Sequence, residues 1–345
     1  MFERKASDLH MHLNGSFSLD FLRQMAEKNN AVAEFQKLKE VREEYTKLLA
    51  QKSLQGMHDK SIALIWTQFG LIHKIMRTLA DIQQGTMNVI EASKARYMEI
   101  RTTPKDMDGS TWGKYVDAFL SGLEEGNKKC NGEKIARGLL SLDRTIHTEK
   151  ISYEIIDRAI LEKKRNGLLV GIDISGNPLG ERKLTGAALA SVLHYALNKG
   201  IGIAIHIGEA DTSTERNDAN IILDILASWS KQSSAGNFFH GKVRLGHGIF
   251  LTEEQRSIIK KLQLPIEVCP SCHEKLNWWN KSKPHPVTHI YQFWKDPVVT
   301  GTDDEIIFGG NAKEENQLVL EMLGYPKDEK MDEARVHQSK FRFAH

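Results

Sequence analysis

Short runs of apolar and β-branched residues recur along the chain, and most are followed by a polar break and then by a segment of helical periodicity. Runs of roughly four to eight such residues are typical of buried strands in a parallel sheet. The pattern predicts eight strands, at residues 8–13, 96–101, 136–142, 168–174, 202–207, 243–246, 266–269 and 298–302. Helical segments occupy the intervals between them, for instance at 153–164, 186–198, 220–230 and 253–262.

Eight strands that alternate with helices indicate βα units on one parallel sheet, and eight strands are enough to close a barrel. We therefore expect an α/β fold, a (β/α)8 TIM barrel, that forms a single domain over residues 1–345. The last helical segment above follows Thr252, with Gln255 three residues later, which is the spacing of a capping box. The first interval, from Gly15 to about Ser93, has a helical pattern throughout. It predicts extra helices after strand one that cover the mouth of the barrel.

Composition excludes several classes of protein. The 47 Lys and Arg residues nearly balance the 45 Asp and Glu residues, so the formal charge of +2 does not point to nucleic acid or to an anionic membrane. No apolar run approaches the roughly 18 residues of a membrane span. Three cysteines are too few for a disulfide framework in a chain of 345 residues. We expect a soluble, cytoplasmic monomer whose partner is a small molecule.

Candidate catalytic residues gather at the carboxyl ends of the predicted strands, where the active sites of such barrels lie. His10 and His12 are two residues apart in strand one, so both imidazoles can face one metal ion. The ends of strands five, six and eight add His206 and Glu209, His247, and Asp303 and Asp304. Neutral imidazoles with one carboxylate suit a Zn²⁺ ion that keeps one position for water.

Each of these groups alone has an ordinary explanation. A His after a strand is more often a hydrogen-bonded structural residue, and an Asp pair is often a helix cap. Four strands that deliver His, Glu or Asp at the same end nevertheless favour a functional site. A binding protein on an inactive barrel is disfavoured, because no candidate ligand or acid is missing.

The segments around these residues resemble the adenosine deaminase family, in the order in which the family has them. The matching segments are HMHLNGS at 10–16, GIDISG at 171–176, HIGE at 206–209, RLGHG at 244–248, EVCPS at 267–271 and TDD at 302–304. The resemblance implies a barrel of the metal-dependent hydrolase type. It also implies hydrolytic removal of the 6-amino substituent from an adenine-type purine.

The resemblance further implies roles for individual residues. It assigns one Zn²⁺ per chain to His10, His12, His206 and Asp303. Glu209 would protonate the ring nitrogen next to the amino-bearing carbon, and His247 would orient the attacking hydroxide. Asp304 would hold another ring nitrogen, and the Gly176 backbone would contact the base. The chemistry agrees, because zinc can lower the pKa of bound water to about 7 and a carboxylic acid in the pocket can supply the proton.

One position separates two branches of the family. The adenosine deaminases proper carry Asp where this chain has Asn14, and that carboxylate would repel a 5′-phosphate. The end of strand two offers hydroxyls and two cations, Arg101 and Lys105, to a phosphate. Both features resemble the adenosine deaminase-like branch, which deaminates N6-methyl-AMP and related N6-substituted nucleotides to IMP. That branch also implies substrate contacts by His73, Thr102, Thr103, Pro104, Lys105 and Asp143.

Several alternatives stay open. Deamination of adenosine to inosine is the alternative reaction. His73 could equally be a helix-surface residue, and Asp143 could form a salt bridge with Arg144.

The sequence allows more than one role for the segment after strand seven. Cys269 and Cys272 form a C-x-x-C that fits a redox pair or half of a structural zinc site, although the chain has no second cysteine pair. The segment 272–279 is close to neither branch. Its Trp278 and Trp279 fit a mobile lid or a packed loop, and we favour the loop.

Overall fold

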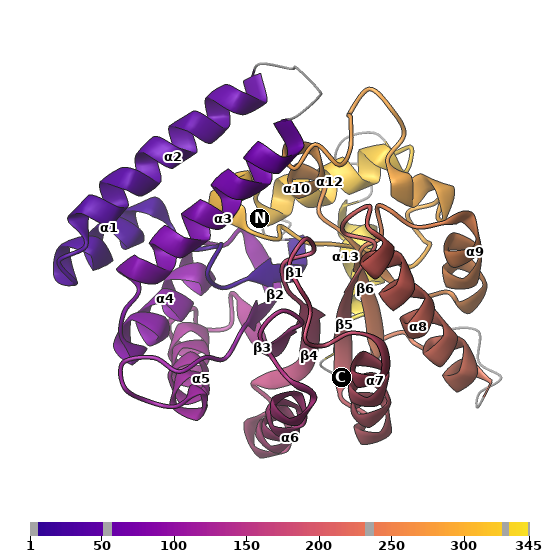
Figure 1. Ribbon diagram of the computed structural model, residues 1–345, viewed down its shortest axis with the longest axis horizontal. Helices are drawn as coiled ribbons and strands as arrows, with labels where there is room; N and C mark the ends of the chain where they lie inside the picture. Colours follow the sequence, from indigo (N-terminus) through magenta and orange to yellow (C-terminus); the bar gives the residue numbers. More distant parts are fainter. Residues whose placement is uncertain (1–5, 51–56, 232–237, 326–330, 344–345) are drawn as a thin grey trace.

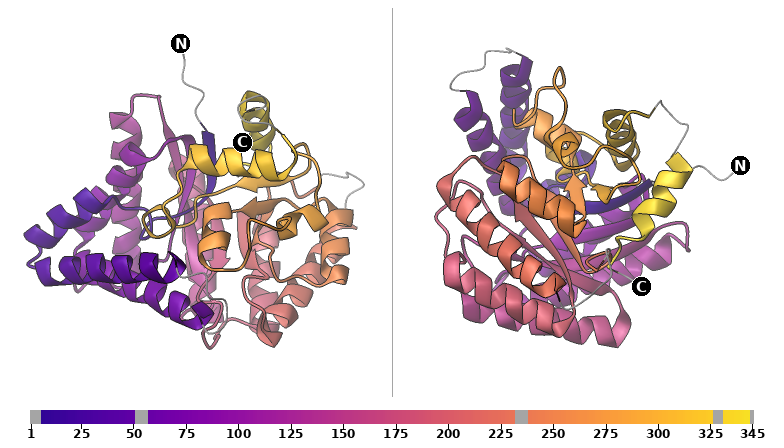
Figure 2. Two further views of the ribbon diagram at one scale, coloured as in Figure 1. Left: turned by 90° about the horizontal axis from the view of Figure 1, so that it is seen from above. Right: turned by 90° about the vertical axis from the view of Figure 1, so that its right-hand side faces the viewer.

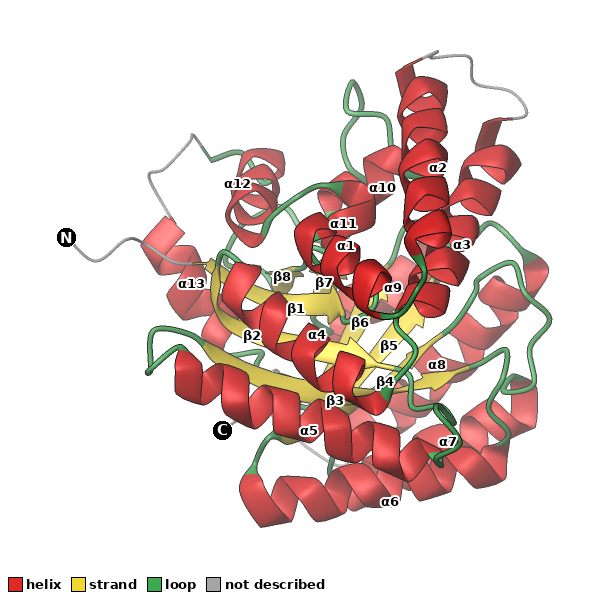
Figure 3. Ribbon diagram, turned by 90° about the vertical axis from the view of Figure 1, so that its left-hand side faces the viewer, coloured by secondary structure: helices red, strands yellow, loops and turns green. Residues whose placement is uncertain are grey.

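The structure, a computed structural model (Figure 1), describes residues 6–50, 57–231, 238–325 and 331–343. Its eight parallel strands lie side by side in chain order (Figure 3). The strands are β1 (Ala6–His12), β2 (Ala95–Thr102), β3 (Ile135–Asp143), β4 (Leu169–Ser175), β5 (Gly202–Ile207), β6 (Val243–His247), β7 (Ile266–Val268) and β8 (Val298–Thr300). The sheet closes next to β8, where Met11 pairs with Asp303 in parallel. There His12 donates its backbone N–H to the Asp303 carbonyl, and Asp303 donates to the His10 carbonyl, both at 2.8 Å. The predicted (β/α)8 barrel is confirmed.

Helices follow the strands and surround the barrel (Figure 2). They are α5 (Trp112–Lys129), α6 (Glu149–Asn166), α7 (Gly186–Lys199), α8 (Ser213–Ser230), α9 (Glu253–Leu262), α10 (Pro270–Lys275), the 3₁₀ helix η1 (Pro286–His289), α11 (Glu305–Phe308), α12 (Ala312–Met322) and α13 (Met331–Ser339). The capping box of Thr252 and Gln255 at the start of α9 is confirmed. In the described part of the chain, no helix is long and apolar enough to cross a membrane.

The helical pattern expected for the first interval is confirmed, and the described residues of this interval form four helices. They are α1 (Leu19–Lys28), α2 (Val32–Ala50), α3 (Met57–Ile75) and α4 (Leu79–Ala92). The α4 helix packs against α5, while α2 and α3 pack against each other as a pair (Figures 1 and 3). Ile65, Trp66 and Phe69 of α3 line a pocket at the carboxyl ends of the strands. The expectation that extra helices cover the barrel mouth therefore holds for α3.

Fully buried charged side chains cross the interior of the barrel. Glu267 accepts hydrogen bonds from Arg244 at 2.6 Å and from Arg101 at 3.0 Å. Arg244 also donates to Glu99 at 2.6 Å, and Arg101 donates to Asp173 at 2.9 Å. Burial disfavours a carboxylate, yet the two guanidinium groups hold the pKa of Glu267 well below its usual range. The interior of the barrel is thus a continuous row of alternating charges.

The segment after α13 closes the end of the barrel at which the strands begin. The Arg244 guanidinium donates to the Phe341 carbonyl at 2.9 Å and lies over the ring of Phe343 at 3.7 Å. The Phe343 N–H donates to Glu99 at 3.0 Å. Gly202 leaves room for this ring, because a Cβ there would lie 2.4 Å from it. The charged interior is therefore shielded from solvent at this end.

We predict that Arg244→Met lowers the free energy of unfolding by about 3–5 kcal/mol, because it leaves Glu99 and Glu267 buried without their shared cation. Denaturant titration measures the loss. The control is Lys128→Met, which removes an exposed pair with Glu124 and should leave the free energy of unfolding unchanged within error. A loss no larger than that of the control would show that the buried row does not stabilise the barrel.

Candidate active site

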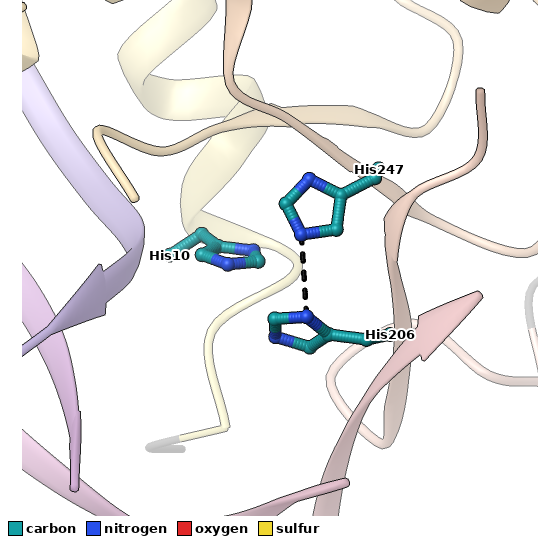
Figure 4. Close-up of side chains that lie close together, drawn as sticks. All are labelled: His10, His206 and His247. Atoms are coloured by element: carbon teal, nitrogen blue, oxygen red, sulfur yellow. Dashed lines mark hydrogen bonds between the residues drawn. The ribbon is translucent and has the colours of Figure 1, made fainter. Parts of the chain in front are cut away.

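Four imidazoles meet at the carboxyl ends of β1, β5 and β6. His10 and His12 come from β1, His206 from β5 and His247 from the last residue of β6. The ring centroids of His10, His206 and His247 lie 4.8 to 4.9 Å apart, with the three rings facing one another (Figure 4). The His12 ring is 5.3 Å from that of His10 and 5.4 Å from that of His206. Three strands thus bring the predicted histidines to one place.

Asp303 follows β8 and completes the cluster. Its Oδ1 lies 3.5 Å from His10 Nε2 and 3.4 Å from His12 Nε2. The backbone is left-handed at Asp303 (φ 61°) and at His247 (φ 65°), a conformation that is costly for residues with a side chain. Gly301 allows the close approach of this segment to β1, because a Cβ there would lie 2.2 Å from the Cβ of His10. The surrounding barrel therefore imposes the backbone that places both side chains.

Two buried carboxylates stand behind the imidazoles. Glu267 lies 2.7 Å from His10 Nδ1, and Asp173 lies 3.4 Å from His206 Nε2. Arg101 bridges these two carboxylates. A carboxylate on the far nitrogen of a histidine fixes the ring and its tautomer, so the other nitrogen is left to bind a metal ion.

The donor set fits a divalent metal ion. Both ring nitrogens of His10 are buried without a hydrogen bond of good geometry, and the carboxylate oxygen of Asp303 lies 3.5 Å from Nε2. Burial disfavours ionised Asp303, but the nearby imidazoles outweigh it and hold the pKa of Asp303 well below its usual range. Burial also lowers the pKa of His12, so its imidazole is neutral. Neutral imidazoles and a carboxylate are the ligands that Zn²⁺ prefers in catalytic sites.

His206 is the exception among these imidazoles. Burial disfavours its charged form, but Asp173 and Glu209 outweigh burial and raise the pKa of His206 to about 10. A metal ion that enters the cluster must therefore displace a proton from this ring.

The two cysteines after β7 are buried beside the cluster and form no disulfide. Burial raises the pKa of both Cys269 and Cys272 well above the ordinary value, so both are thiols without redox activation. Cys272 contacts Asp303 and, together with His247 and His273, forms a group with metal-ligand spacing. These findings do not favour a redox pair.

Two acids border the metal-ligand cluster. Glu209 lies 3.1 Å from His206 Nδ1 and 3.8 Å from His247 Nε2. Burial and the neighbouring Asp303 raise the pKa of Asp304 well above its usual value, so its carboxyl group is protonated and can donate a hydrogen bond. Gly15 makes room for Asp304, because a Cβ on Gly15 would collide with that carboxyl group.

A pocket of about 430 Å³ opens directly onto the cluster. Most residues predicted for substrate or metal line it: His12, Asn14, His73, Thr102, Thr103, Lys105, Asp143, Gly176, His206, Glu209, Asp303 and Asp304. His10 and His247 lie buried beneath its floor. Pro104 does not line the pocket, and its backbone instead contacts His147. The structure thus gathers the predicted residues around one cavity, with Pro104 set back from it.

The two cations expected at the end of β2 have different surroundings. Arg101 faces the pocket, but its charge is neutralised by Asp173 and Glu267 in the barrel interior, so the expectation that it serves a phosphate is wrong. Lys105 is half-buried in the pocket wall, and burial lowers its pKa to about 8. Among the described residues, no carboxylate lies within ion-pair distance of Lys105. Lys105 is therefore a cation in the pocket wall that has no anionic partner among the described residues.

Tyr115 of α5 holds two residues of the pocket wall. Its hydroxyl is 2.7 Å from Thr102 Oγ1 and also hydrogen-bonds the side chain of Asn14. Tyr115 is fully buried, and this burial raises its pKa to about 12. Beyond an apolar position on a helix, nothing in the sequence points to Tyr115 as a residue of the site.

Asp143 faces the pocket and does not pair with its neighbour. It accepts hydrogen bonds from the N–H and the hydroxyl of Thr145 at 2.8 and 2.7 Å. Arg144 points away and pairs with Glu215, so the alternative of an Asp143–Arg144 salt bridge is wrong. Gly176, at φ 126°, lies against Asp143, and a Cβ there would come within 2.5 Å of its carboxylate. His73 is exposed at the pocket wall, so its helix-surface position and its predicted contact are compatible.

One wall of the pocket is apolar. It consists of Ile62, Ile65, Trp66 and Phe69 from α3 together with Leu276, Trp278 and Phe308. Trp278 and Trp279 are both buried, so the packed loop favoured by the sequence is what the structure shows. A plain helical pattern does not reveal which face of α3 borders a ligand.

Comparison with known proteins supports this picture. The family model described as adenosine deaminase matches residues 5–344. An adenosine deaminase-like protein of Drosophila pseudoobscura pseudoobscura is 27% identical over 94% of this chain and 87% of its own length. The N6-mAMP deaminase of Arabidopsis thaliana is 28% identical over 95% of this chain and 90% of its own length.

A solved structure, that of Arabidopsis ADAL complexed with GMP, is 27% identical and superposes with a TM-score of 0.76. The alignment covers 99% of this chain and 93% of the other.

Proposed function

Because this chain belongs to the adenosine deaminase family and is a hydrolase of a purine carbon–nitrogen bond, we propose that it converts N6-methyl-AMP and other N6-substituted AMP to IMP and an amine. The observation that carries the proposal is the half-buried Lys105, a cation in the pocket wall without a carboxylate partner among the described residues. A phosphate would supply the missing anion. The name of the Arabidopsis N6-mAMP deaminase and the GMP bound in the Arabidopsis ADAL structure support a nucleotide.

The polar residues around Lys105 suit a phosphate as well. Thr102 and Thr103 belong to the same turn, and their hydroxyls can donate hydrogen bonds. Asn14 adds no negative charge and is anchored through Tyr115. The apolar wall from α3 gives a substituent on the purine a surface free of charge.

The proposed metal ligands are His10, His12, His206 and Asp303, with Zn²⁺ as the ion. A zinc ion in this cluster would supply a water nucleophile that is activated at neutral pH. Glu267 and Asp173 orient the rings of His10 and His206.

The remaining groups act on the purine. Glu209 stands at the pocket surface beside the cluster and protonates the ring nitrogen next to the amino-bearing carbon, which makes that carbon more electrophilic. His247 holds the attacking oxygen from the buried side. Asp304, protonated in its buried position, donates to a second ring nitrogen. The backbone of Gly176 and the carboxylate of Asp143 complete the contacts to the nucleoside.

The test is turnover of adenosine, AMP, N6-methyladenosine and N6-methyl-AMP by the purified, zinc-loaded protein, followed by ultraviolet absorbance. We expect kcat/KM to be at least about 100-fold higher for N6-methyl-AMP than for N6-methyladenosine, since each charge-assisted hydrogen bond contributes about 1.5–3 kcal/mol. Preferred turnover of adenosine would replace the nucleotide with a nucleoside substrate. No turnover of any of the four would refute the purine assignment.

Glu209→Gln should lower kcat by at least about 100-fold, because the amide cannot supply the proton. Metal content and the circular dichroism spectrum should stay unchanged, which separates lost chemistry from lost structure. Glu181→Gln, on the exposed segment after β4, is the matched control and should retain activity. Near-normal turnover by Glu209→Gln would remove this residue from the mechanism.

Asn14→Asp should lower kcat/KM for N6-methyl-AMP at least about 10-fold more than for N6-methyladenosine, since it brings a carboxylate toward the phosphate. Asn14→Ala removes the same amide without adding charge, so it should lower kcat/KM for the two substrates by more similar factors. An equal loss on both substrates in the Asp variant would show that Asn14 does not face the phosphate.

A further inference from the structure

A row of three imidazoles leads away from the metal-ligand cluster into the packed loop after β7. His247 Nδ1 lies 3.1 Å from His273 Nε2, and His273 Nδ1 lies 2.9 Å from His285 Nε2. All three side chains are buried. The row ends at the backbone, where the Val287 N–H donates to His285 Nδ1 at 3.1 Å. Two of its members, His273 and His285, have no role in the function proposed above.

The backbone contact sets the direction of every hydrogen bond in the row. A backbone N–H can only donate, so His285 Nδ1 must accept, and a neutral imidazole then carries its proton on Nε2. That Nε2–H donates to His273 Nδ1, which places the proton of His273 on its own Nε2. The same step repeats at His247, whose Nδ1 accepts and whose Nε2 carries the proton. Burial lowers the pKa of His273 and His285, the latter to about 3, so both rings are neutral.

Aromatic packing holds the row in place. The Trp278 ring stacks on His273 at an interplanar angle of 29°, and the Trp279 ring meets His285 edge-on with centroids 4.9 Å apart. The backbone N–H groups of both tryptophans donate to the His273 carbonyl at 2.9 and 3.0 Å. These contacts hold both rings against their neighbours, and a half-turn of either imidazole would break its hydrogen bonds within the row.

We propose that His273 and His285 are positioning residues that fix the tautomer of His247, so that His247 presents an Nε2–H donor to the metal-ligand cluster. His247 Nε2 is the nitrogen on that side: it lies 3.2 Å from His206 Nδ1 (Figure 4). It also lies 3.8 Å from Glu209. The catalytic consequence rests on the proposed function: His247 donates to the attacking oxygen and has no lone pair with which to act as its base. The tautomer itself does not depend on what the substrate is.

The first readout is spectroscopic. Full-length, zinc-loaded protein with isotopically labelled histidine gives ring nitrogen chemical shifts, which distinguish protonated from unprotonated nitrogens. The His247 signals are assigned by their absence in His247→Gln. We expect Nε2 protonated and Nδ1 unprotonated in the parent protein, and loss of this preference in His273→Leu. A protonated Nδ1 in the parent protein, or an unchanged tautomer in His273→Leu, would overturn the proposal.

The second readout is kinetic. His273→Leu should lower kcat by about 10- to 100-fold with little change in KM, the usual cost of losing a partner that orients a site histidine. His273→Gln keeps a donor toward His247 and should recover most of the activity. His285→Phe keeps a ring against Trp279, removes both nitrogens and should show an intermediate loss. Equal losses of kcat in His273→Gln and His273→Leu would indicate that His273 acts through packing alone, which would overturn its positioning role.

The two proposals fail separately. If the four purines are not turned over but the tautomer of His247 shifts in His273→Leu, the positioning role stands and the deaminase assignment falls. If N6-methyl-AMP is turned over and neither the tautomer nor kcat changes in the variants, the deaminase stands and His273 is a structural core residue.

Discussion

The carboxylate of Glu267 joins the interior of the barrel to its active site. One oxygen accepts from Arg244, and the other accepts from Arg101 and lies against His10. A carboxylate buried this completely stays ionised only while its cations are in place. The charges that hold the strands together therefore also set the orientation of a proposed metal ligand. Stability and the geometry of the site depend on the same side chain.

The sequence predicts the barrel well because strands of a parallel sheet are buried on both faces and so appear as continuous apolar runs. It also predicts where the site lies, because the carboxyl ends of the strands share one face of the barrel. His10, His206 and Asp303 lie far apart in the chain, yet a closed barrel of parallel strands brings the carboxyl ends of their strands to one face. The pocket contains Asn14, Asp143 and Gly176 for the same reason, since each closely follows or ends a strand.

The features that the sequence does not predict depend on contacts between segments that are far apart in the chain. Arg101 has the composition of a phosphate ligand, and only the position of Asp173 and Glu267 shows that its charge is already neutralised. The left-handed backbone at Asp303 accompanies barrel closure and the close passage of Gly301 over β1, and a second left-handed residue, His247, ends β6. The role of Tyr115 and the apolar face of α3 likewise appear only once helices are packed. The segment carrying His273 lacked a clear family pattern, and its function depends on three rings meeting in space.

The closure of the barrel by the segment around Phe341 and Phe343 has a consequence for biosynthesis. Phe341 accepts a hydrogen bond from Arg244, about 100 positions earlier in the chain. Phe343 donates one to Glu99, about 240 positions earlier. During translation, the strands bearing both charges leave the ribosome well before the segment that covers them. Contacts between residues so distant in sequence form slowly, because a long loop must close first. Until the segment around Phe341 and Phe343 has been synthesised, Arg244 and Glu99 therefore lack these backbone partners, and this end of the nascent barrel stays open to water.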